Sequence, residues 1–216
     1  MSGTGAMGGD PLAFVAGWAV MMTAMMLPGA MPMIALYGAI QRRAADASVK
    51  GVPVAVFTLV YLAVWAASGI PAYGATVLGE GLPPAMVPYA VAASLVAAGA
   101  WQLSPFKQVC LRACRSPIGF LLGRWRAGVR GSLSLGWRHA VYCLGCCWAL
   151  MLVLVAAGAM GFAWVVLVAA LVAAEKLAPR GEWVARAAGV GLVALGLVAA
   201  ARPEIVSMLR DTMQAM

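Results

Sequence analysis

The thiol and imidazole side chains of this sequence are concentrated in one short stretch. The 216 residues include one His and five Cys, and all six lie between residues 110 and 147. They are Cys110, Cys114, His139, Cys143, Cys146 and Cys147. Thiolate and imidazole are soft or borderline ligands that suit Cu(I), Zn(II) or an iron–sulfur centre. The concentration of these residue types therefore predicts a metal site in this part of the chain.

The first two cysteines share a predicted helical face with a lysine. Cys110 and Cys114 are four residues apart, which places their Cβ atoms about 5–6 Å apart on a helix. Lys107 falls on the same face. A nearby cation lowers the pKa of a thiol and favours the thiolate, the form that binds metal. We therefore expect this short helix to contribute two thiols to the metal site.

A second face belongs to the apolar stretch that begins at His139. At about 100° per residue, His139, Cys143 and Cys146 lie within about 60° of one another. Cys147 lies at the edge of that arc. A single cysteine in an apolar helix is usually only a small buried hydrophobic residue. Five Cys and one His at helical spacings favour a metal site over that alternative.

Methionines add further sulfur near the start of the chain. Three of them share one helical face: Met22, Met25 and Met26. Met33 rejoins this face only if the helix stays regular through Pro28 and Pro32, where we expect a kink. Thioether sulfur prefers Cu(I) to Zn(II), so these residues are candidate weak sites along a metal pathway. The alternative is that methionine simply fills the core.

Two charged residues, Glu175 and Lys176, lie inside a predicted membrane span. An acidic residue at such a place is costly and is a functional candidate. Glu175 is a candidate metal ligand, hydrogen-bond partner of a metal-bound His139, or proton acceptor. The alternative is an ion pair between the two residues or at the interface, with the Lys176 side chain extended towards the lipid headgroups.

The composition identifies the setting of these residues as a membrane. Hydrophobic residues make up 64% of the chain and charged residues only 10%, with a mean hydropathy of +0.93. Soluble domains carry about a quarter charged residues. We therefore predict an all-α, polytopic helical membrane protein that forms a single transmembrane domain over residues 1–216. The first apolar run is too long for a cleavable signal peptide, so we expect that helix to be retained.

About six transmembrane helices are predicted, because a helix of about 20 apolar residues crosses a bilayer. The stretches are Leu12–Ile40, Val54–Leu78, Ala85–Leu103, His139–Met160, Phe162–Leu177 and Trp183–Ala200. Segment 104–138 is too polar to cross. Its two Ser-Pro pairs predict short interfacial helices near Pro105–Cys114 and Pro117–Ala127. We expect the arginines of the second short helix to lie among lipid headgroups.

The basic residues predict the orientation. The loops after the first, third and fifth spans, with the adjoining helix ends, hold 13 of the 15 Lys and Arg residues. An excess of Lys and Arg marks the cytoplasmic side. We therefore expect a multi-pass protein of the inner (plasma) membrane with both termini outside the cytoplasm. The net charge of +8 follows from this topology, and we expect no nucleic-acid partner.

Several ordered motifs resemble the DUF2182 family of bacterial integral membrane proteins, which are described as predicted metal-binding. The motifs are Cys110 to Pro117, Gly136 to His139, Tyr142 to Trp148, Glu175-Lys176 and Met21 to Pro28. The resemblance covers the chain from about Trp18 to Pro179. It implies a metal-binding membrane protein.

Two classes of function remain open from the sequence. The first is the handling of a soft metal ion, copper with zinc as the alternative, by a transporter or a membrane metal chaperone with a protein partner in delivery. The second is a membrane thiol redox enzyme, for which Cys143 and Cys146 have the Cys-x-x-Cys spacing. Cysteines on the reducing cytoplasmic side weigh against that second class. A structural subunit of a membrane complex is a third possibility.

Overall fold

The computed structural model describes residues 10–44, 51–124, 128–156, 162–204 and 206. All regular structure within these residues is helical, which confirms the predicted fold class. The elements are α1 (Pro11–Ala44), α2 (Val52–Ala67), α3 (Gly69–Glu80), η2 (Pro84–Met86), α4 (Val87–Leu103), α5 (Pro105–Arg115), α6 (Pro117–Leu122), α7 (Gly128–Ala156), α8 (Phe162–Leu177) and α9 (Gly181–Ala201).

The helices are long and apolar enough to make this a polytopic membrane protein. Within the described residues, five segments qualify as candidate spans: Pro11–Arg42, Val52–Glu80, Pro84–Leu103, Gly128–Ala156 and Gly181–Ala201. They correspond to five of the six predicted stretches. The remaining stretch coincides with α8, whose 16 residues are shorter than the about 20 that cross a bilayer. Its crossing therefore stays a prediction.

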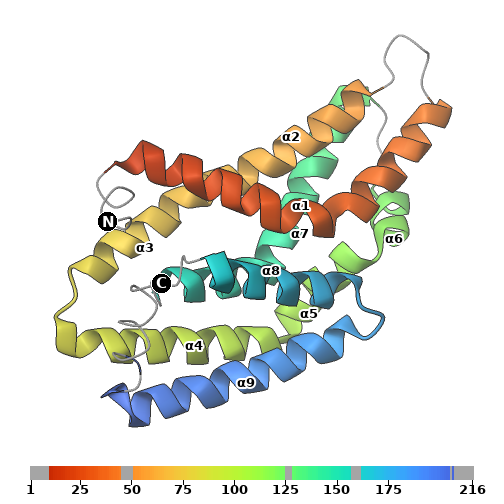
Figure 1. Ribbon diagram of the computed structural model, residues 1–216. Coiled ribbons are helices and arrows are strands. Elements are labelled where there is room, and N and C mark those ends of the chain that lie inside the picture. Colours follow the sequence, from red (N-terminus) through yellow and green to blue (C-terminus); the bar gives the residue numbers. More distant parts are fainter. Residues whose placement is uncertain (1–9, 45–50, 125–127, 157–161, 205, 207–216) are drawn as a thin grey trace.

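The helices pack in three layers (Figure 1). α1 and the α2–α3 pair form one outer layer, α4 and α9 form the other, and α7 and α8 lie between them. α7 is the most buried span, with 56% of its apolar window buried compared with 22–28% in the other spans. Side chains on α7 therefore face protein on several sides. A metal site on this helix would be shielded from lipid.

Close packing between the layers depends on glycines. A Cβ added to Gly99 of α4 would lie 2.7 Å from the carbonyl oxygen of Gly189 in α9, and one added to Gly196 would lie 2.9 Å from the carbonyl oxygen of Ala92. Gly136 of α7 similarly abuts the backbone of Phe57 in α2 at 2.7 Å. Small residues let helix backbones approach closely in lipid. The glycines of α9 that face α4, Gly189 and Gly196, have this packing role.

The sequence predicts a kink in α1 at its internal prolines. α1 runs continuously from Pro11 to Ala44 with Pro28 and Pro32 inside it. Figure 1 shows that the helix changes direction part-way along its length. Each proline removes one backbone hydrogen bond, which weakens the helix at that point.

The two short helices begin where the sequence predicts. The Ser104 hydroxyl accepts a hydrogen bond from the Lys107 backbone N–H at 3.2 Å and caps α5. α6 starts at Pro117 but ends at Leu122, and residues 125–127 of its predicted range lie outside the described residues. The Arg124 guanidinium stacks on the rings of Phe120 and Tyr142, 5.1 and 5.6 Å from their centroids. Arg124 therefore contacts protein as well, and the expected place of the arginines among headgroups stays a prediction.

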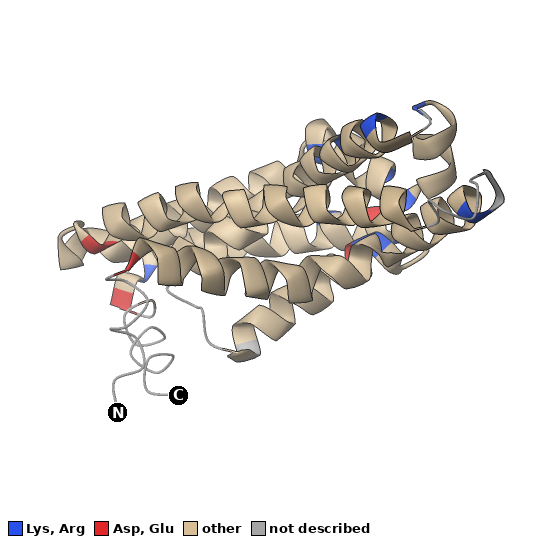
Figure 2. Cartoon of the chain, turned by 90° about the horizontal axis from the view of Figure 1, so that it is seen from above, with Lys and Arg blue, Asp and Glu red and all other residues tan. Residues whose placement is uncertain are grey.

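Charge is distributed unevenly along the bundle (Figure 2). Most Lys and Arg residues gather at one end. α1 begins and α9 ends at the opposite end (Figure 1). Arg43, Lys50, Arg126 and Arg210 of the sequence argument lie outside the residues whose side chains are described.

Candidate metal centre

Three cysteines of α7 point into the bundle together. Cys143, Cys146 and Cys147 are each only 1% exposed. The sulfur atoms of Cys146 and Cys147 lie 3.2 Å apart, and the Cys146 thiol donates to the Cys143 carbonyl oxygen at 3.2 Å. Adjacent residues on a helix differ by about 100° in direction, so the Cys147 side chain lies at the edge of this face, as expected.

A fourth thiol comes from α5. Cys114 is buried in the same core cluster as the three α7 cysteines, and its thiol interacts with those of Cys143 and Cys146. The interaction with Cys143, together with burial, raises the pKa of the Cys114 thiol. α5 packs directly on α7, and this contact brings the two sequence-distant groups of cysteines together. That Cys114 is a metal ligand stays a prediction.

Cys110 lies apart from these four thiols. It is half-buried, and its sulfur packs against Gly145, where an added Cβ would lie 2.9 Å away. Burial raises the pKa of the Cys110 thiol, and Lys107 only partly opposes that rise. Lys107 acts on the Cys110 thiol in the expected direction, but the net shift disfavours the thiolate because desolvation outweighs the nearby charge.

Lys176 of α8 reaches the thiols from the other side. Its ammonium lies 3.0 Å from the Cys143 sulfur and 3.9 Å from the Met26 sulfur, and the residue is only 6% exposed. The alternative in which Lys176 extends towards the headgroups is therefore wrong. The lysine stem lies against Gly29 of α1, where an added Cβ would be 2.9 Å from the Lys176 Cδ atom.

Tyr61 and Met26 complete the surroundings of Cys143. The Tyr61 hydroxyl lies 3.0 Å from the Cys143 sulfur and 3.3 Å from the Met26 carbonyl oxygen. Met22 and Met25 are buried in the same core cluster as the α7 cysteines, whereas Met33 packs in a separate cluster with Tyr37 and Phe57. Of the predicted methionine face, the structure brings Met26 closest to the thiol chemistry by the contacts it makes.

His139 lies one turn before Cys143 in a cage of aromatic rings. The ring centroids of Phe57, Tyr61 and Phe120 are 5.8, 5.5 and 5.5 Å from that of the imidazole. His139 is 2% exposed, and its Nδ1 atom has no hydrogen-bond partner among the residues that the structure describes. Leaving a buried nitrogen without a hydrogen bond costs free energy. The Nδ1 atom of His139 is therefore available to bind a ligand one helical turn from Cys143.

Glu175 has partners other than those expected from the sequence. Its carboxylate accepts hydrogen bonds from the Lys107 ammonium at 2.6 Å and from the Gln102 side-chain amide at 2.7 Å. Lys107 and Glu175 are 0% and 1% exposed. The alternative of an ion pair between Glu175 and Lys176 is therefore wrong, and the carboxylate is directed to α4 and α5. The Arg115 guanidinium donates to the Glu175 and Pro179 carbonyl oxygens at the end of α8.

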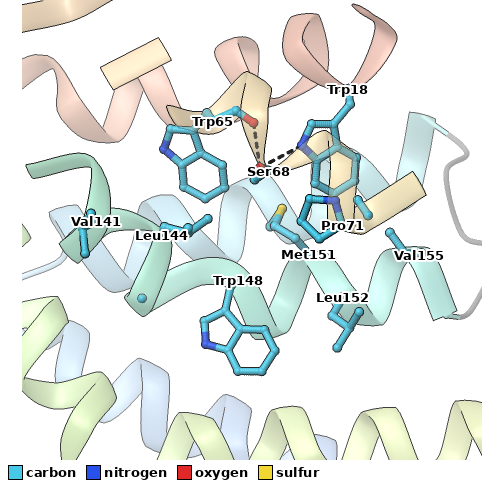
Figure 3. A pocket seen from close by; sticks show the side chains of 12 residues that line it. Trp18, Trp65, Ser68, Pro71, Val141, Leu144, Trp148, Met151, Leu152 and Val155 are labelled. Atoms are coloured by element: carbon cyan, nitrogen blue, oxygen red, sulfur yellow. Dashed lines mark hydrogen bonds between the residues drawn. The ribbon is translucent and has the colours of Figure 1, made fainter. Parts of the chain in front are cut away.

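The apolar pocket on the other side of α7 is separate from the sulfur cluster. It has a volume of about 540 Å³ and is lined by residues such as Trp18, Trp65 and Trp148 (Figure 3). The Trp18 indole donates to the Ser68 hydroxyl at 3.0 Å, and that hydroxyl donates to the Trp65 carbonyl oxygen. None of the cysteines lines this pocket.

The chemistry of the cluster is that of soft donors in a dry interior. Three other thiols, a thioether and a lysine ammonium lie around Cys143. Such sulfur donors suit Cu(I) better than hard cations. Within the described residues, no group of three or more His, Cys, Asp or Glu side chains has the arrangement of a metal-holding site. The Cys143 sulfur instead contacts Lys176 and Tyr61.

A comparison with protein families decides which kind of protein carries this cluster. The sequence profile of PpoB2, described as a copper chaperone, matches residues 15–199. The chain belongs to the PpoB2 copper chaperone family. This family corresponds to DUF2182, so the resemblance drawn from the sequence motifs is confirmed. No curated protein and no solved structure shows significant similarity to the chain.

Membership in the PpoB2 family makes copper the implied metal and agrees with the soft-metal prediction. Sequence reasoning missed Tyr61 and did not assign Lys176 to the cluster. Tyr61 gave no signal, because a tyrosine in an apolar span is ordinary. Lys176 did give a signal, because it is a cation in a span that holds few charges. The sequence alone does not say whether its side chain points to lipid or to sulfur.

Proposed function

We propose that this PpoB2 family member binds Cu(I) in the membrane through the thiol cluster and passes it to a protein partner. The ligands are drawn from Cys143, Cys146 and Cys147 of α7 and Cys114 of α5. The observation that carries the proposal is the convergence of these four buried thiols from two helices. Thiolate is a soft ligand that binds Cu(I) well and hard cations poorly, and copper is the metal that the family implies.

The buried position of the cluster supports handling of copper and not thiol redox catalysis. A redox enzyme needs a thiol that its substrate can reach, and the three α7 cysteines are each 1% exposed. Adjacent cysteines such as Cys146 and Cys147 also make a strained disulfide pair. A single monovalent ion needs only a narrow path to reach sulfur.

Methionines of α1 extend the sulfur donors away from the cluster. Met26 lies at the Lys176 ammonium, and Met22 and Met25 are buried further along the same helix. Thioethers bind Cu(I) more weakly than thiolates do, so they suit transfer. We propose that Cu(I) moves between the thiols and this methionine face on its way to the partner. The alternative function is transport, in which Cu(I) follows the same path but is released across the bacterial inner membrane and not passed to a partner.

The orientation that this proposal requires places the basic end of the bundle in the cytoplasm. The basic residues at that end support it by the positive-inside tendency. α5 and the start of α7 belong to this end (Figure 1). The thiols then lie nearer the reducing compartment, where they stay reduced.

Copper content of the purified protein tests the proposal. The detergent-purified protein is loaded anaerobically with Cu(I), desalted and analysed for copper per chain. We expect near-stoichiometric copper in the wild type and its loss in the Cys143→Ala/Cys146→Ala/Cys147→Ala variant. Cys110→Ser is the matched control, because Cys110 lies apart against Gly145, and it should retain copper.

Other outcomes contradict the proposal in different ways. Copper that is retained by the triple variant would place the site elsewhere in the chain. A wild-type protein that holds neither Cu(I) nor Zn(II), yet shows a reversible disulfide between α7 cysteines, would favour thiol redox chemistry.

A further inference from the structure

The lysine at the sulfur cluster has no carboxylate partner in the part of the chain that the structure describes. The ion pairs there join Lys107 to Glu175 and Arg202 to Glu204. Lys176 instead directs its ammonium at the Cys143 sulfur, 3.0 Å away, with the Met26 sulfur at 3.9 Å. A buried ammonium is costly unless it is paired, so this placement needs a reason.

The fold holds the ammonium in this position through a groove in α1. Gly29 has no side chain, and the Lys176 stem occupies the space that one would fill: an added Cβ would lie 2.9 Å from Cδ and 3.5 Å from Nζ. α1 and α8 pack against each other, so the stem is trapped between helices. The positive charge is therefore a fixed part of the cluster and not a mobile surface charge.

We infer that the Lys176 ammonium is the charge that makes this thiol cluster prefer a singly charged metal ion over a doubly charged one. This inference rests on the proposed function. Repulsion between the ammonium and a bound cation is proportional to the cation's charge, so it weakens Zn(II) binding about twice as much in free energy as Cu(I) binding. Lys176 and the α7 cysteines are buried, so solvent screens this repulsion less than it would at the surface.

The sulfur ligands alone leave this discrimination incomplete. Thiolates bind both Cu(I) and Zn(II), and each thiolate attracts the doubly charged ion more strongly. An ammonium beside the ligands opposes that advantage. Competition between metal and protons for the sulfur acts on both metals at one pH, so it largely cancels from the ratio of the two affinities. That ratio is therefore the quantity that reports Lys176.

The experiment measures dissociation constants for Cu(I) and for Zn(II) by anaerobic competition with chromophoric chelators in detergent. Lys176→Met removes the charge and keeps a side chain of similar length. Gly29→Ala keeps the charge and displaces the stem from its groove. Gly74→Ala is the matched control, because a Cβ there meets nothing within 4 Å.

We expect the preference for Cu(I) over Zn(II) to fall about tenfold or more in Lys176→Met and to fall in the same direction in Gly29→Ala. Gly74→Ala should keep the wild-type preference. A lysine that only stabilises the fold would change the amount of folded protein and leave the ratio of affinities unaltered.

Two results overturn the inference, and they are distinguishable. If Lys176→Met has the wild-type ratio while Cys143→Ala still loses Cu(I), the role of Lys176 is refuted and the copper site stands. If Cu(I) binding is independent of the α7 cysteines, the proposed function fails, and the role of Lys176 fails with it.

Discussion

At the scale of single residues, the unusual feature of this chain is polar chemistry buried in an apolar bundle. Lys107, Glu175 and Lys176 are all nearly inaccessible. The sequence shows that these charges lie in or near spans, but not which atoms they meet. A helical period fixes the face on which a residue lies, and only the packing of α4, α5 and α8 decides that Glu175 meets Lys107.

The buried ion pair between Lys107 and Glu175 predicts a large cost for removing one partner. Glu175→Gln leaves the Lys107 ammonium without its counter-ion, and we expect a loss of about 3 kcal/mol in the free energy of unfolding in detergent. The double variant Lys107→Met/Glu175→Gln should recover part of that loss. If the losses in unfolding free energy of the two single variants simply add in the double variant, the two residues are not coupled and the described ion pair is contradicted.

An exposed pair provides the control for this measurement. Arg202 and Glu204 are 3.9 Å apart and 68% and 62% exposed. Arg202→Gln should change the unfolding free energy by less than about 1 kcal/mol, because exposed pairs contribute little.

Cys110 predicts a distinctive pH profile for alkylation. Burial raises the pKa of its thiol, so less thiolate exists at neutral pH than in an exposed cysteine. We expect the rate of reaction with iodoacetamide, followed by mass spectrometry, to rise with pH and reach its half-maximum above the ordinary thiol value. Since Lys107 lowers this pKa, Lys107→Met should move the midpoint higher still. A midpoint below the ordinary value would contradict the described environment of Cys110.

At the scale of elements, the sequence predicts the helices better than it predicts their partners. Apolar runs and the Ser104-Pro105 start identify the spans and α5, because length, caps and proline act locally. The contacts of α7 with α2, α4 and α5 depend on how the side chains of the helices fit together in three dimensions, which local sequence patterns do not predict. α8 shows a limit of composition as a guide to membrane spans. Its 16 residues are as apolar as those of a span, so composition alone does not say whether this short helix crosses the bilayer.

The contact between α4 and α9 predicts a position-specific effect of adding one methyl group. In Gly196→Ala the new Cβ would lie 2.6 Å from a Val96 methyl and 2.9 Å from the Ala92 carbonyl oxygen, so the helices must separate. We expect a loss of about 1–3 kcal/mol in stability, measured by thermal unfolding in detergent.

Gly191 of the same helix is the matched control for that substitution. A Cβ at Gly191 meets nothing within 4 Å. Gly191→Ala should therefore be neutral or slightly stabilising, because alanine favours the helix by up to about 1 kcal/mol. Equal effects at the two positions would contradict the described contact between α4 and α9.

At the scale of the whole molecule, charge asymmetry and helix number predict one topology. Lys and Arg gather at one end of the bundle, and α1 begins and α9 ends at the other (Figures 1 and 2). Alkaline phosphatase fused after residue 204 should be active outside the cytoplasm, and green fluorescent protein at the same place should be dark. The opposite pair of results would contradict the predicted orientation, with the basic end in the cytoplasm.

The sulfur cluster links these scales, because it needs Cys114 from α5, three cysteines from α7 and the lysine from α8 in one place. The sequence predicts which residues are soft ligands and that they gather on helical faces. It does not predict that Cys110 turns away towards Gly145, or that Lys176 faces Cys143. Those outcomes depend on a glycine on the neighbouring helix in each case.

X-ray absorption at the copper edge of the Cu(I)-loaded protein tests the central claim most directly, because the spectrum identifies the ligand atoms. We predict a first shell made of sulfur in the wild type and in Cys110→Ser, and its loss in the Cys143→Ala/Cys146→Ala/Cys147→Ala variant. A first shell of nitrogen or oxygen alone, or a sulfur shell unchanged in the triple variant, would contradict the assignment of Cu(I) to these thiols.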